Sequence, residues 1–397
     1  MTVELRTPTD ADWPAFCHAD GYGFGVTYTP ERIERIRPQY DLSRFRMVVE
    51  DGQIAAVAGS YAFDVTLPGG VCVPLGGVTW VATIPTHRGR GLMRQVVEAV
   101  HADIDARGEA VAGLYASQGG LYQRYGYGVA SRRVDVTINR HLAQLRPEFR
   151  GCGGDVRIVS GDDVVAAIEP IWDRFRRLRS TEVSRPDWHL DFAAEQASPP
   201  EGGFSAPVYL VHPDGYAKYI TKMDWGNGHP QHQLELIEIA AVTPDAHAAL
   251  WSVLLGMDLI GTIHSSRLAI DDPVPSLLID PREVRTDGNN DGVWFNVRDV
   301  SIAFGARCYR TEDRFVVEVE GKKWAIEGGL EGGSCRVVRT KADVVTDHGG
   351  LGSLLSGHGV PSAMAANRQM TTRNADVLRR ADLFFPTSLA PNCQTGY

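Results

Sequence analysis

Glycines and arginines alternate in one short segment of the sequence, a combination suited to holding an anion. The segment reads His87-Arg88-Gly89-Arg90-Gly91-Leu92-Met93-Arg94 and follows an apolar run that ends at Pro85. The N–H groups in the first turn of a helix point outward with the positive end of its dipole, and glycines let a diphosphate lie against the backbone. Neither a P-loop nor a GxGxxG fingerprint is present, which argues against ATP and NAD. We therefore predict a diphosphate site of another class; a basic helix start on a solvated face is the alternative.

A tyrosine later in the chain has the chemistry of a general acid. Tyr122 lies in the segment Ala116-Ser117-Gln118-Gly119-Gly120-Leu121-Tyr122, directly after an apolar run. A phenol has a pKa of about 10, so it can protonate a departing thiolate whose conjugate acid has a pKa of about 8.5. Tyr122 is therefore a candidate acid for cleavage of a thioester, with a buried helix aromatic as the alternative.

Strands and helices are expected to alternate around these residues. A hairpin turns at Asp51-Gly52, Pro85 stops a strand because it has no N–H to donate, and Gly108 suits the left-handed position that ends a helix. The predicted order is a helix starting at 9–12, a hairpin over 45–61, a strand over 77–84, a helix over 92–104, a strand over 111–116 and a short helix to 125.

Two turn-rich stretches, 151–154 and 287–292, divide the chain because they combine permissive residues with no apolar period. A length of 397 residues also suggests two to four compact units. The middle segment repeats the order of strand, proline and helix over 234–255, but its junction at 244–247 has no glycine and no arginine. We expect a duplicated unit there that binds no nucleotide-like cofactor.

The last segment has a different pattern. Period-two strands are predicted over 314–320 and 323–327, and helical spacing follows over 351–355 and 363–368. The final residues, 386–397, are predicted to be extended because their two prolines bias the preceding residues away from the helical region.

The two chemical motifs together resemble the GCN5-related N-acetyltransferases (GNAT). Arg88-x-x-Gly91-x-Met93 is similar to the acetyl-CoA loop of that family, and Tyr122-x-x-x-Gly126-Tyr127 to its later helix. Over nearly its full length the chain resembles the Eis (enhanced intracellular survival) group of bacterial acetyltransferases. The stretches that carry this resemblance are 85–92, 116–122, 212–217 and 365–368.

The resemblance implies an α+β fold of three domains. It consists of an N-terminal catalytic GNAT domain over 1–150, a degenerate second GNAT-like domain over 151–288, both with mixed central sheets flanked by helices, and a sterol-carrier-protein-like (SCP2-like) α/β domain over 289–397. It also implies acetyl-CoA as the cofactor, no metal, and a homo-oligomer, hexameric in several members. The expected substrate is a primary amine of a small cationic molecule, such as an aminoglycoside or a polyamine.

The resemblance also assigns roles to residues. Tyr122 would be the acid, and the terminal carboxylate of Tyr397 would complete the catalytic pair; because its ordinary pKa is about 3.5, burial must raise that pKa or a water must relay the proton. The Val81 amide is expected at the acetyl carbonyl and Thr83 at the pantetheine arm. The predicted cofactor-binding residues are Val81, Ala82, Thr83, Arg88, Gly89, Arg90, Gly91, Leu92, Met93 and Ser117. The predicted substrate pocket contains Phe24, Val26, Ile36 and Gly396.

Composition excludes several other classes of function. The formal charge of -9 opposes nucleic-acid binding, and the N-terminus has no secretory signal and the chain no membrane span, so we expect a cytoplasmic protein. The six cysteines form no CxxC pair, and 287–292 begins like a calcium loop but has Arg298 where a glutamate is required. His229 and His232 have no nearby carboxylate, so no metal site is expected. Two alternatives remain open: a protein-lysine acetyltransferase, and a lipid or sterol carrier that acts through the C-terminal domain.

Overall fold

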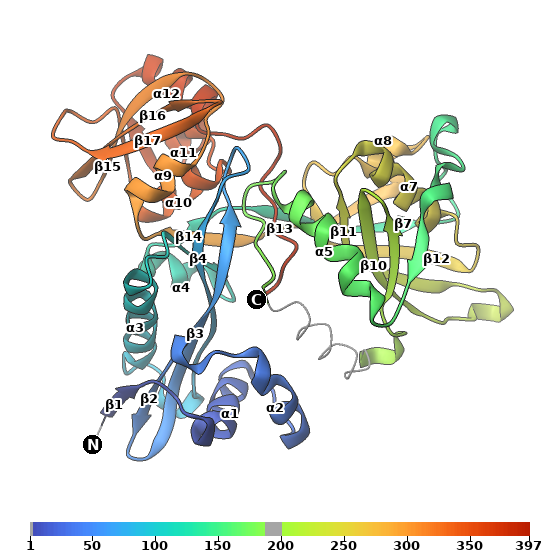
Figure 1. Cartoon of the computed structure of the whole chain (residues 1–397), viewed down its shortest axis with the longest axis horizontal. Coiled ribbons are helices and arrows are strands. Elements are labelled where there is room, and N and C mark those ends of the chain that lie inside the picture. The colour runs from blue at the N-terminus through green and yellow to red at the C-terminus, as the bar shows by residue number, and fades with distance from the viewer. Residues whose placement is uncertain (1–2, 187–200) are drawn as a thin grey trace.

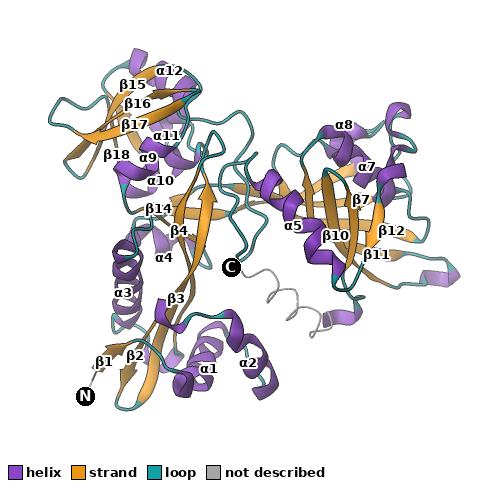
Figure 2. Ribbon diagram, in the orientation of Figure 1, coloured by secondary structure: helices purple, strands orange, loops and turns teal. Residues whose placement is uncertain are grey.

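Three β-sheets with their helices make up the described part of the chain, residues 3–186 and 201–397 of a computed structural model (Figures 1 and 2). No helix in these residues is long and apolar enough to cross a membrane. The first sheet has seven strands. In spatial order they are β1 (Val3–Arg6), β2 (Phe45–Glu50), β3 (Gln53–Thr66), β4 (Cys72–Thr83), β5 (Val111–Tyr115), β14 (Val293–Val297) and β6 (Gly128–Val129).

Helices cover both faces of the first sheet because successive side chains of a strand point to opposite sides. Met47 packs with α1 (Trp13–Phe24) and α2 (Pro30–Ile36), whereas its neighbour Val48 packs with α3 (Leu92–Ala106). The predicted hairpin, the strand before Pro85 and the helix after it are all confirmed, and the short predicted helix is α4 (Gly119–Tyr122).

The second sheet also has seven strands, and α5 (Asp163–Arg176) and α7 (Pro244–Leu255) pack on its opposite faces. Its strands β11 and β12 run parallel, as β4 and β5 do in the first sheet, so the predicted repeat of strand, proline and helix is confirmed. The short α8 (Val274–Leu277) lies on the side of α7. The strands are, in spatial order, β13 (Val284–Asp291), β7 (Arg132–Asn139), β12 (Ile260–Ala269), β11 (His232–Ala241), β10 (Gly215–Lys222), β9 (Val208–His212) and β8 (Arg157–Val159).

The prediction of a linker at 287–292 is wrong, because most of this stretch belongs to β13. β13 pairs antiparallel with β7 from Val284 to Asp291, and a bulge after Thr286 accommodates the turn-forming residues. The side-chain amide of Asn290 also donates to Asp135 on β7. Local composition could not reveal a partner strand that lies so far away in the sequence. Strand membership also crosses the predicted domain limits at 150 and 288, since β7 lies in the second sheet and β14 in the first.

The third unit has a sheet of five strands with helices packed against it. Its core continues into the first sheet, because Leu75, Val111 and Phe295 belong to the same buried cluster as Phe315 and Phe384. The elements are β15 (Asp313–Val319), β16 (Lys322–Gly329), β17 (Gly332–Val337), β18 (Val344–Thr346), β19 (Met370–Thr372), α9 (Val300–Ala306), α10 (His348–Ser356), α11 (Pro361–Ala366) and α12 (Ala375–Phe384).

The tail that follows α12, residues 386–397, is not helical, as predicted, and forms no strand. We call each sheet with the helices that pack on it a unit. The tail leaves the third unit and ends between the first and second units, near the middle of the molecule (Figure 1). The tail therefore connects the third unit with the other two.

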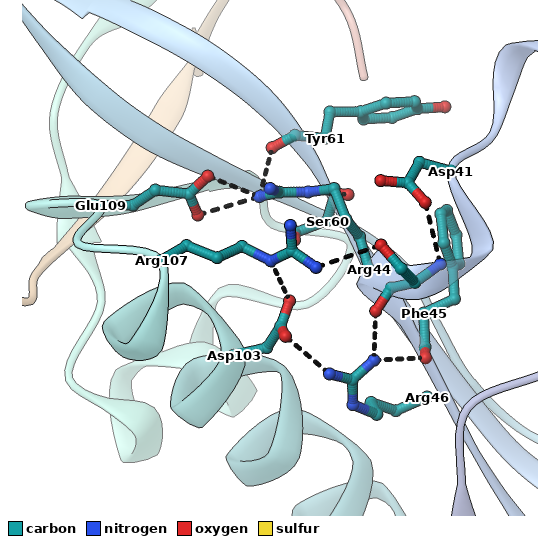
Figure 3. Close-up of polar contacts among 10 residues, drawn as sticks. Asp41, Arg44, Phe45, Arg46, Ser60, Tyr61, Asp103, Arg107 and Glu109 are labelled. Atoms are coloured by element: carbon teal, nitrogen blue, oxygen red, sulfur yellow. Dashed lines mark hydrogen bonds and ion pairs between the residues drawn. The ribbon is translucent and has the colours of Figure 1, made fainter.

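A buried ion pair joins the segment that follows α3 to the hairpin of β2 and β3 in the first sheet (Figure 3). The Arg44 guanidinium donates to both carboxylate oxygens of Glu109, at 2.7 and 2.9 Å, and to the backbone carbonyls of Ser60 and Tyr61. Burial raises the pKa of Glu109, although Arg44 acts in the opposite direction. Since Glu109 follows α3, this pair fixes the helix whose N-terminus carries the glycine-rich turn.

We expect Glu109→Ala to lower the local free energy of unfolding by about 3–5 kcal/mol, because it leaves the Arg44 charge buried without a partner. Hydrogen exchange of the β2 and β3 amides measures this loss. As a control, Glu98→Ala removes an exposed partner of Arg94 and should change the exchange free energies by less than about 1 kcal/mol. Equal effects of the two variants would contradict the role of the buried pair.

Candidate active site

The glycine-rich turn before α3 has the open backbone that the sequence predicted. Gly89 and Gly91 both have φ of +76°, and a Cβ at either position would meet nothing within 4 Å. Backbone conformation therefore requires glycine at both positions, whereas crowding does not. The first helical hydrogen bond runs from Gln95 N to Gly91 O, so the N–H groups of Leu92, Met93 and Arg94 precede the helical ladder. This turn can receive an anion directly on its backbone.

The arginines of the turn hold it to the rest of the first unit. The Arg88 guanidinium donates to the carbonyl of Gly23 at the end of α1, at 3.0 Å. Arg90 donates to the buried carboxylate of Glu50 at 2.6 Å, and His87 Nε2 lies 3.3 Å from the other oxygen of Glu50. These contacts link the turn to α1 and to β2. In this arrangement the backbone of the turn presents the donors, and the two arginines secure its position.

A β-bulge in β4 lies directly before the turn. Pairing with β3 shifts from Gly59↔Thr79 to Val57↔Ala82, so that Trp80 and Val81 share one partner on β3. Trp80 has φ of +54°, which is unusual for a bulky residue and indicates a locally strained backbone. A bulge leaves one residue outside the ladder, and its peptide group is then available to a ligand.

Two further residues that the sequence predicted at the cofactor site lie at the end of β4. Ala82 is buried against α1, where a Cβ on Gly23 would lie only 2.6 Å from the Ala82 Cβ. The Thr83 Oγ1 is buried and has no hydrogen-bond partner among the described residues. A buried hydroxyl without a partner is costly, so this oxygen is suited to a ligand that supplies one.

β4 and β5 separate next to the bulge. Their parallel pairing covers only Leu75–Gly77 on β4 and Val111–Gly113 on β5. The ring of Tyr397 lies where they part: a Cβ on Gly77 would be 3.1 Å from its Cδ2, and one on Gly113 would be 2.7 Å from its Oη. At Gly113 the tyrosine hydroxyl is the nearest obstacle to a Cβ, whereas at Gly77 the Phe63 ring is nearer still, at 2.7 Å.

The Tyr397 ring is held by aromatic neighbours. Phe63 and Tyr115 have ring centroids 5.1 and 5.4 Å from it. Its Oη is buried without a described partner, and burial raises the pKa of this phenol well above its usual value. The end of the chain therefore lies inside the first unit's strand opening.

Tyr122 lies at the end of α4 and is only 4% exposed. Burial raises the pKa of its phenol, while a hydrogen bond with the Ser117 side chain acts in the opposite direction, so the hydroxyl stays protonated at neutral pH. Tyr122 packs in one cluster with Leu92, and Val81 and Met93 contact the same cluster. The structure thus brings together residues from the bulge, the glycine-rich turn and the predicted acid.

A cavity of about 400 Å³ lies between the first and second units. Gly396 lines it, as predicted, but the other three predicted pocket residues are not among the residues that line it. Phe24 is the last residue of α1 and Val26 follows the helix, and both are about half exposed. Ile36 packs against the core beneath α1 and α2. The aromatic lining residues are Tyr40, Tyr61, Phe63, Tyr209, Tyr216 and Tyr397; the charged ones are Arg185, Lys218, Glu238 and Arg267.

Glu238 is the only carboxylate side chain among the lining residues that the structure describes. Arg185 donates to its two oxygens at 3.1 and 3.0 Å, and the Tyr216 hydroxyl donates to it as well. The negative charge of Glu238 is therefore paired with the positive charge of Arg185 in the wall of the cavity.

Residues from two units fix the tail. The Tyr115 hydroxyl donates to the carbonyls of Cys393 and Thr395, at 3.0 and 2.8 Å. Arg267 donates to the Gln394 carbonyl at 3.0 Å, and the Glu182 carboxylate accepts from the Gln394 N–H at 3.1 Å. None of these anchors could be predicted from the sequence, because no local pattern marks a residue that contacts a segment so distant in the chain.

The described residues contain no group of three or more His, Cys, Asp or Glu side chains that could hold a metal ion.

Comparison with known proteins agrees with this geometry. One acetyltransferase (GNAT) domain family matches residues 4–130, and a second family of the same description matches residues 182–298. The chain is 33% identical to the N-acetyltransferase Eis of Mycobacterium tuberculosis and 30% identical to an uncharacterized N-acetyltransferase of Streptomyces griseus, over 98% and 99% of each chain. The crystal structure of Eis1 from Mycobacterium abscessus is similar over 100% of both chains, with a TM-score of 0.87 and 26% identity.

The Glu182 anchor predicts a pH-dependent stability. Burial raises the pKa of Glu182 to about 8, so the folded protein keeps a proton that the unfolded chain releases near pH 4.5. The free energy of unfolding should therefore fall as the pH rises from about 4.5 to about 8. We expect Glu182→Gln, which is neutral throughout, to reduce the difference in Tm between pH 5 and pH 9. The exposed Glu331→Gln should leave that difference as in the parent, and an unchanged difference in the Glu182 variant would refute the assignment.

Proposed function

Since the chain belongs to the Eis family of N-acetyltransferases, acyltransferases built on GNAT domains, we propose that it transfers the acetyl group of acetyl-CoA directly to a primary amine of a small molecule. The observation that supports this most strongly is the open turn at Gly89 and Gly91, which lies beside a bulge and a strand opening. Val81 at the bulge, Thr83 and the glycine-rich turn follow one another along the chain, which is the order in which acetyl-CoA carries its acetyl carbonyl, pantetheine arm and diphosphate.

The residues present fit acetyl-CoA. The backbone of the turn would hold the diphosphate through the N–H groups that precede the helical ladder. The Val81 amide would donate to the acetyl carbonyl, and the Thr83 hydroxyl, which has no described partner, would bind the pantetheine arm. When bound, acetyl-CoA supplies an activated thioester.

The protein must also move two protons. An alkyl ammonium has a pKa of about 10.4 and must lose a proton before its nitrogen can attack, and the departing sulfur must gain one. We assign the proton of the sulfur to Tyr122, because its raised pKa keeps the phenol protonated at neutral pH. The second proton, which the attacking nitrogen loses as the amide forms, restores the phenol. We assign the first proton, that of the ammonium, to the terminal carboxylate of Tyr397, directly or through a water, because Gly396 and Tyr397 line the cavity.

The proposed amine is a small cationic molecule of the aminoglycoside or polyamine type. The cavity volume of about 400 Å³ lies in the range of small-molecule sites. Its tyrosine and phenylalanine walls suit an ammonium group, which is attracted to the faces of aromatic rings. Peptide lysines offered in competition with small amines test the alternative of protein acetylation.

The remaining expectations from the family resemblance are also proposals. These are a division into three domains near 150 and 288, apart from the exchange of β7 and β14 between the first two sheets, a sterol-carrier-like third domain over 289–397, a hexamer and a cytoplasmic location. The continuous core shared by the third unit and the first sheet supports a structural role for the third unit, in place of independent lipid transport.

Titration calorimetry with CoA tests cofactor binding. Gly91→Ala should weaken the affinity for CoA at least tenfold, since the new Cβ would enter the open space proposed for the diphosphate and a non-glycine residue at positive φ costs about 1–2 kcal/mol. Gly108→Ala introduces the same strain at the other end of α3, where φ is +72°, and should leave CoA affinity unchanged. The proposal fails if the folded parent gives no heat with CoA, or if both variants weaken it equally.

Steady-state kinetics test the acid. Tyr122→Phe removes the proton donor and should lower kcat about 10²-fold, with the KM for acetyl-CoA within a factor of two. Tyr219→Phe removes another buried phenol, in the core of the second sheet, and should leave kcat unchanged. Full turnover by the Tyr122 variant would remove Tyr122 from the mechanism.

A further inference from the structure

The second sheet contains an opening like that of the first, and the tail of the chain fills it. β11 and β12 pair in parallel over His232–Glu235 and Ile260–His264, and their pairing then ends. Beyond that point the side chain of Gln394 bonds to the backbone of β11 at Ile239. The Ile239 N–H donates to Gln394 Oε1 at 3.1 Å, and Gln394 Nε2 donates to the Ile239 carbonyl at 2.8 Å.

The side chain of Gln394 acts as a substitute for a neighbouring strand. A carboxamide carries a donor and an acceptor in one plane, as a peptide group does, and here both are used on a single residue of β11. Arg267, on β12, donates to the Gln394 carbonyl from the other side of the opening. Gln394 is 7% exposed, so loss of its amide would leave two buried peptide groups of β11 without partners.

The same tail reaches the opening of the first sheet three residues later. An extended chain of three residues spans about 10 Å, so the position of Gln394 limits where Tyr397 can lie. At that distance the Tyr397 ring sits over Gly77 and Gly113, where β4 leaves β5. The tail therefore joins two equivalent openings, one on each sheet.

We propose that the strand opening of the second sheet is a receptor for the chain's own tail, and that Gln394 is the positioning residue that sets Tyr397 in the active site. This inference rests on the proposed function, because it gives the second unit a role in that reaction. In the first sheet the opening would receive acetyl-CoA. In the second sheet the side-chain amide of Gln394 forms hydrogen bonds with the exposed edge of β11. The second unit thus serves the chemistry of the first without a cofactor of its own.

The test compares two substitutions at one position. Gln394→Leu removes both hydrogen bonds, and Gln394→Glu keeps an acceptor but loses the donor to the Ile239 carbonyl. We expect each variant to lower kcat at least tenfold while the Kd for CoA, measured by calorimetry, stays within a factor of two. We also expect carboxypeptidase to release Tyr397 faster from both variants than from the parent. The glutamate variant serves as the test if the leucine variant does not fold.

A matched control lies earlier in the same tail. Ser388→Ala changes an exposed residue before the anchored part, and should alter neither turnover nor the release of Tyr397. Unchanged kcat or unchanged carboxypeptidase sensitivity in the Gln394 variants overturns the inference and leaves the proposed function intact. A parent chain that binds no CoA overturns the proposed function, while the protease measurement still reports whether Gln394 anchors the tail.

A chain extended by one glycine after Tyr397 separates docking from chemistry. It keeps Gln394 and the tyrosine ring but moves the terminal carboxylate by one residue. We expect the Gln394 contacts to persist, seen as slow hydrogen exchange at Ile239, while turnover falls. Fast exchange at Ile239 in this chain would show that the end of the tail, and not Gln394, holds the segment, and would also overturn the inference.

Discussion

Two pairs of parallel strands that separate partway along their length determine how this protein is organised. β4 leaves β5 after Gly77, and β11 leaves β12 after Glu235, so each pair exposes a strand edge to an opening within the sheet. Buried peptide groups require hydrogen-bond partners, and an opening of this kind must be filled by something that supplies them. In the first sheet the proposed partner is acetyl-CoA, whose pantetheine arm contains amide groups. In the second, the side chain of Gln394 already provides both bonds to Ile239.

This constraint explains why three units are needed around one cavity. The tail emerges from the third unit, docks on the second and ends in the first, and residues of the first and second units line the cavity next to it. The third unit and the first sheet share a continuous core, so the start of the tail is fixed relative to β4 and β5. On the other side, Arg44 and Glu109 hold the segment after α3 to the hairpin of β2 and β3.

Burial controls the protonation of the groups that matter here. Burial of Tyr122 raises the pKa of its phenol, which keeps a proton available for a departing sulfur. Glu182 is also buried, and burial raises its pKa. Near neutral pH its carboxyl group can therefore accept the hydrogen bond from the Gln394 N–H without placing a full charge in the interior. Glu238 faces the cavity but is neutralised by Arg185, so the wall carries a paired carboxylate. The same physical effect therefore prepares the acid and stabilises the segment that the proposed base belongs to.

The sequence by itself determined the local features: the strand, glycine-rich turn and helix around Gly89 and Gly91, the repeated order at 234–255 and the non-helical tail. Hydrophobic period, turn residues and proline act over a few neighbouring residues, and a motif such as that of Tyr122 lies within one such stretch. Only the tertiary structure decided that Trp80 adopts a bulge, that 287–292 forms a strand against β7, and that Tyr115, Glu182 and Arg267 hold the tail. These features depend on partners far away in the chain, and no pattern within a short window records which distant strand edge or carbonyl a residue will meet.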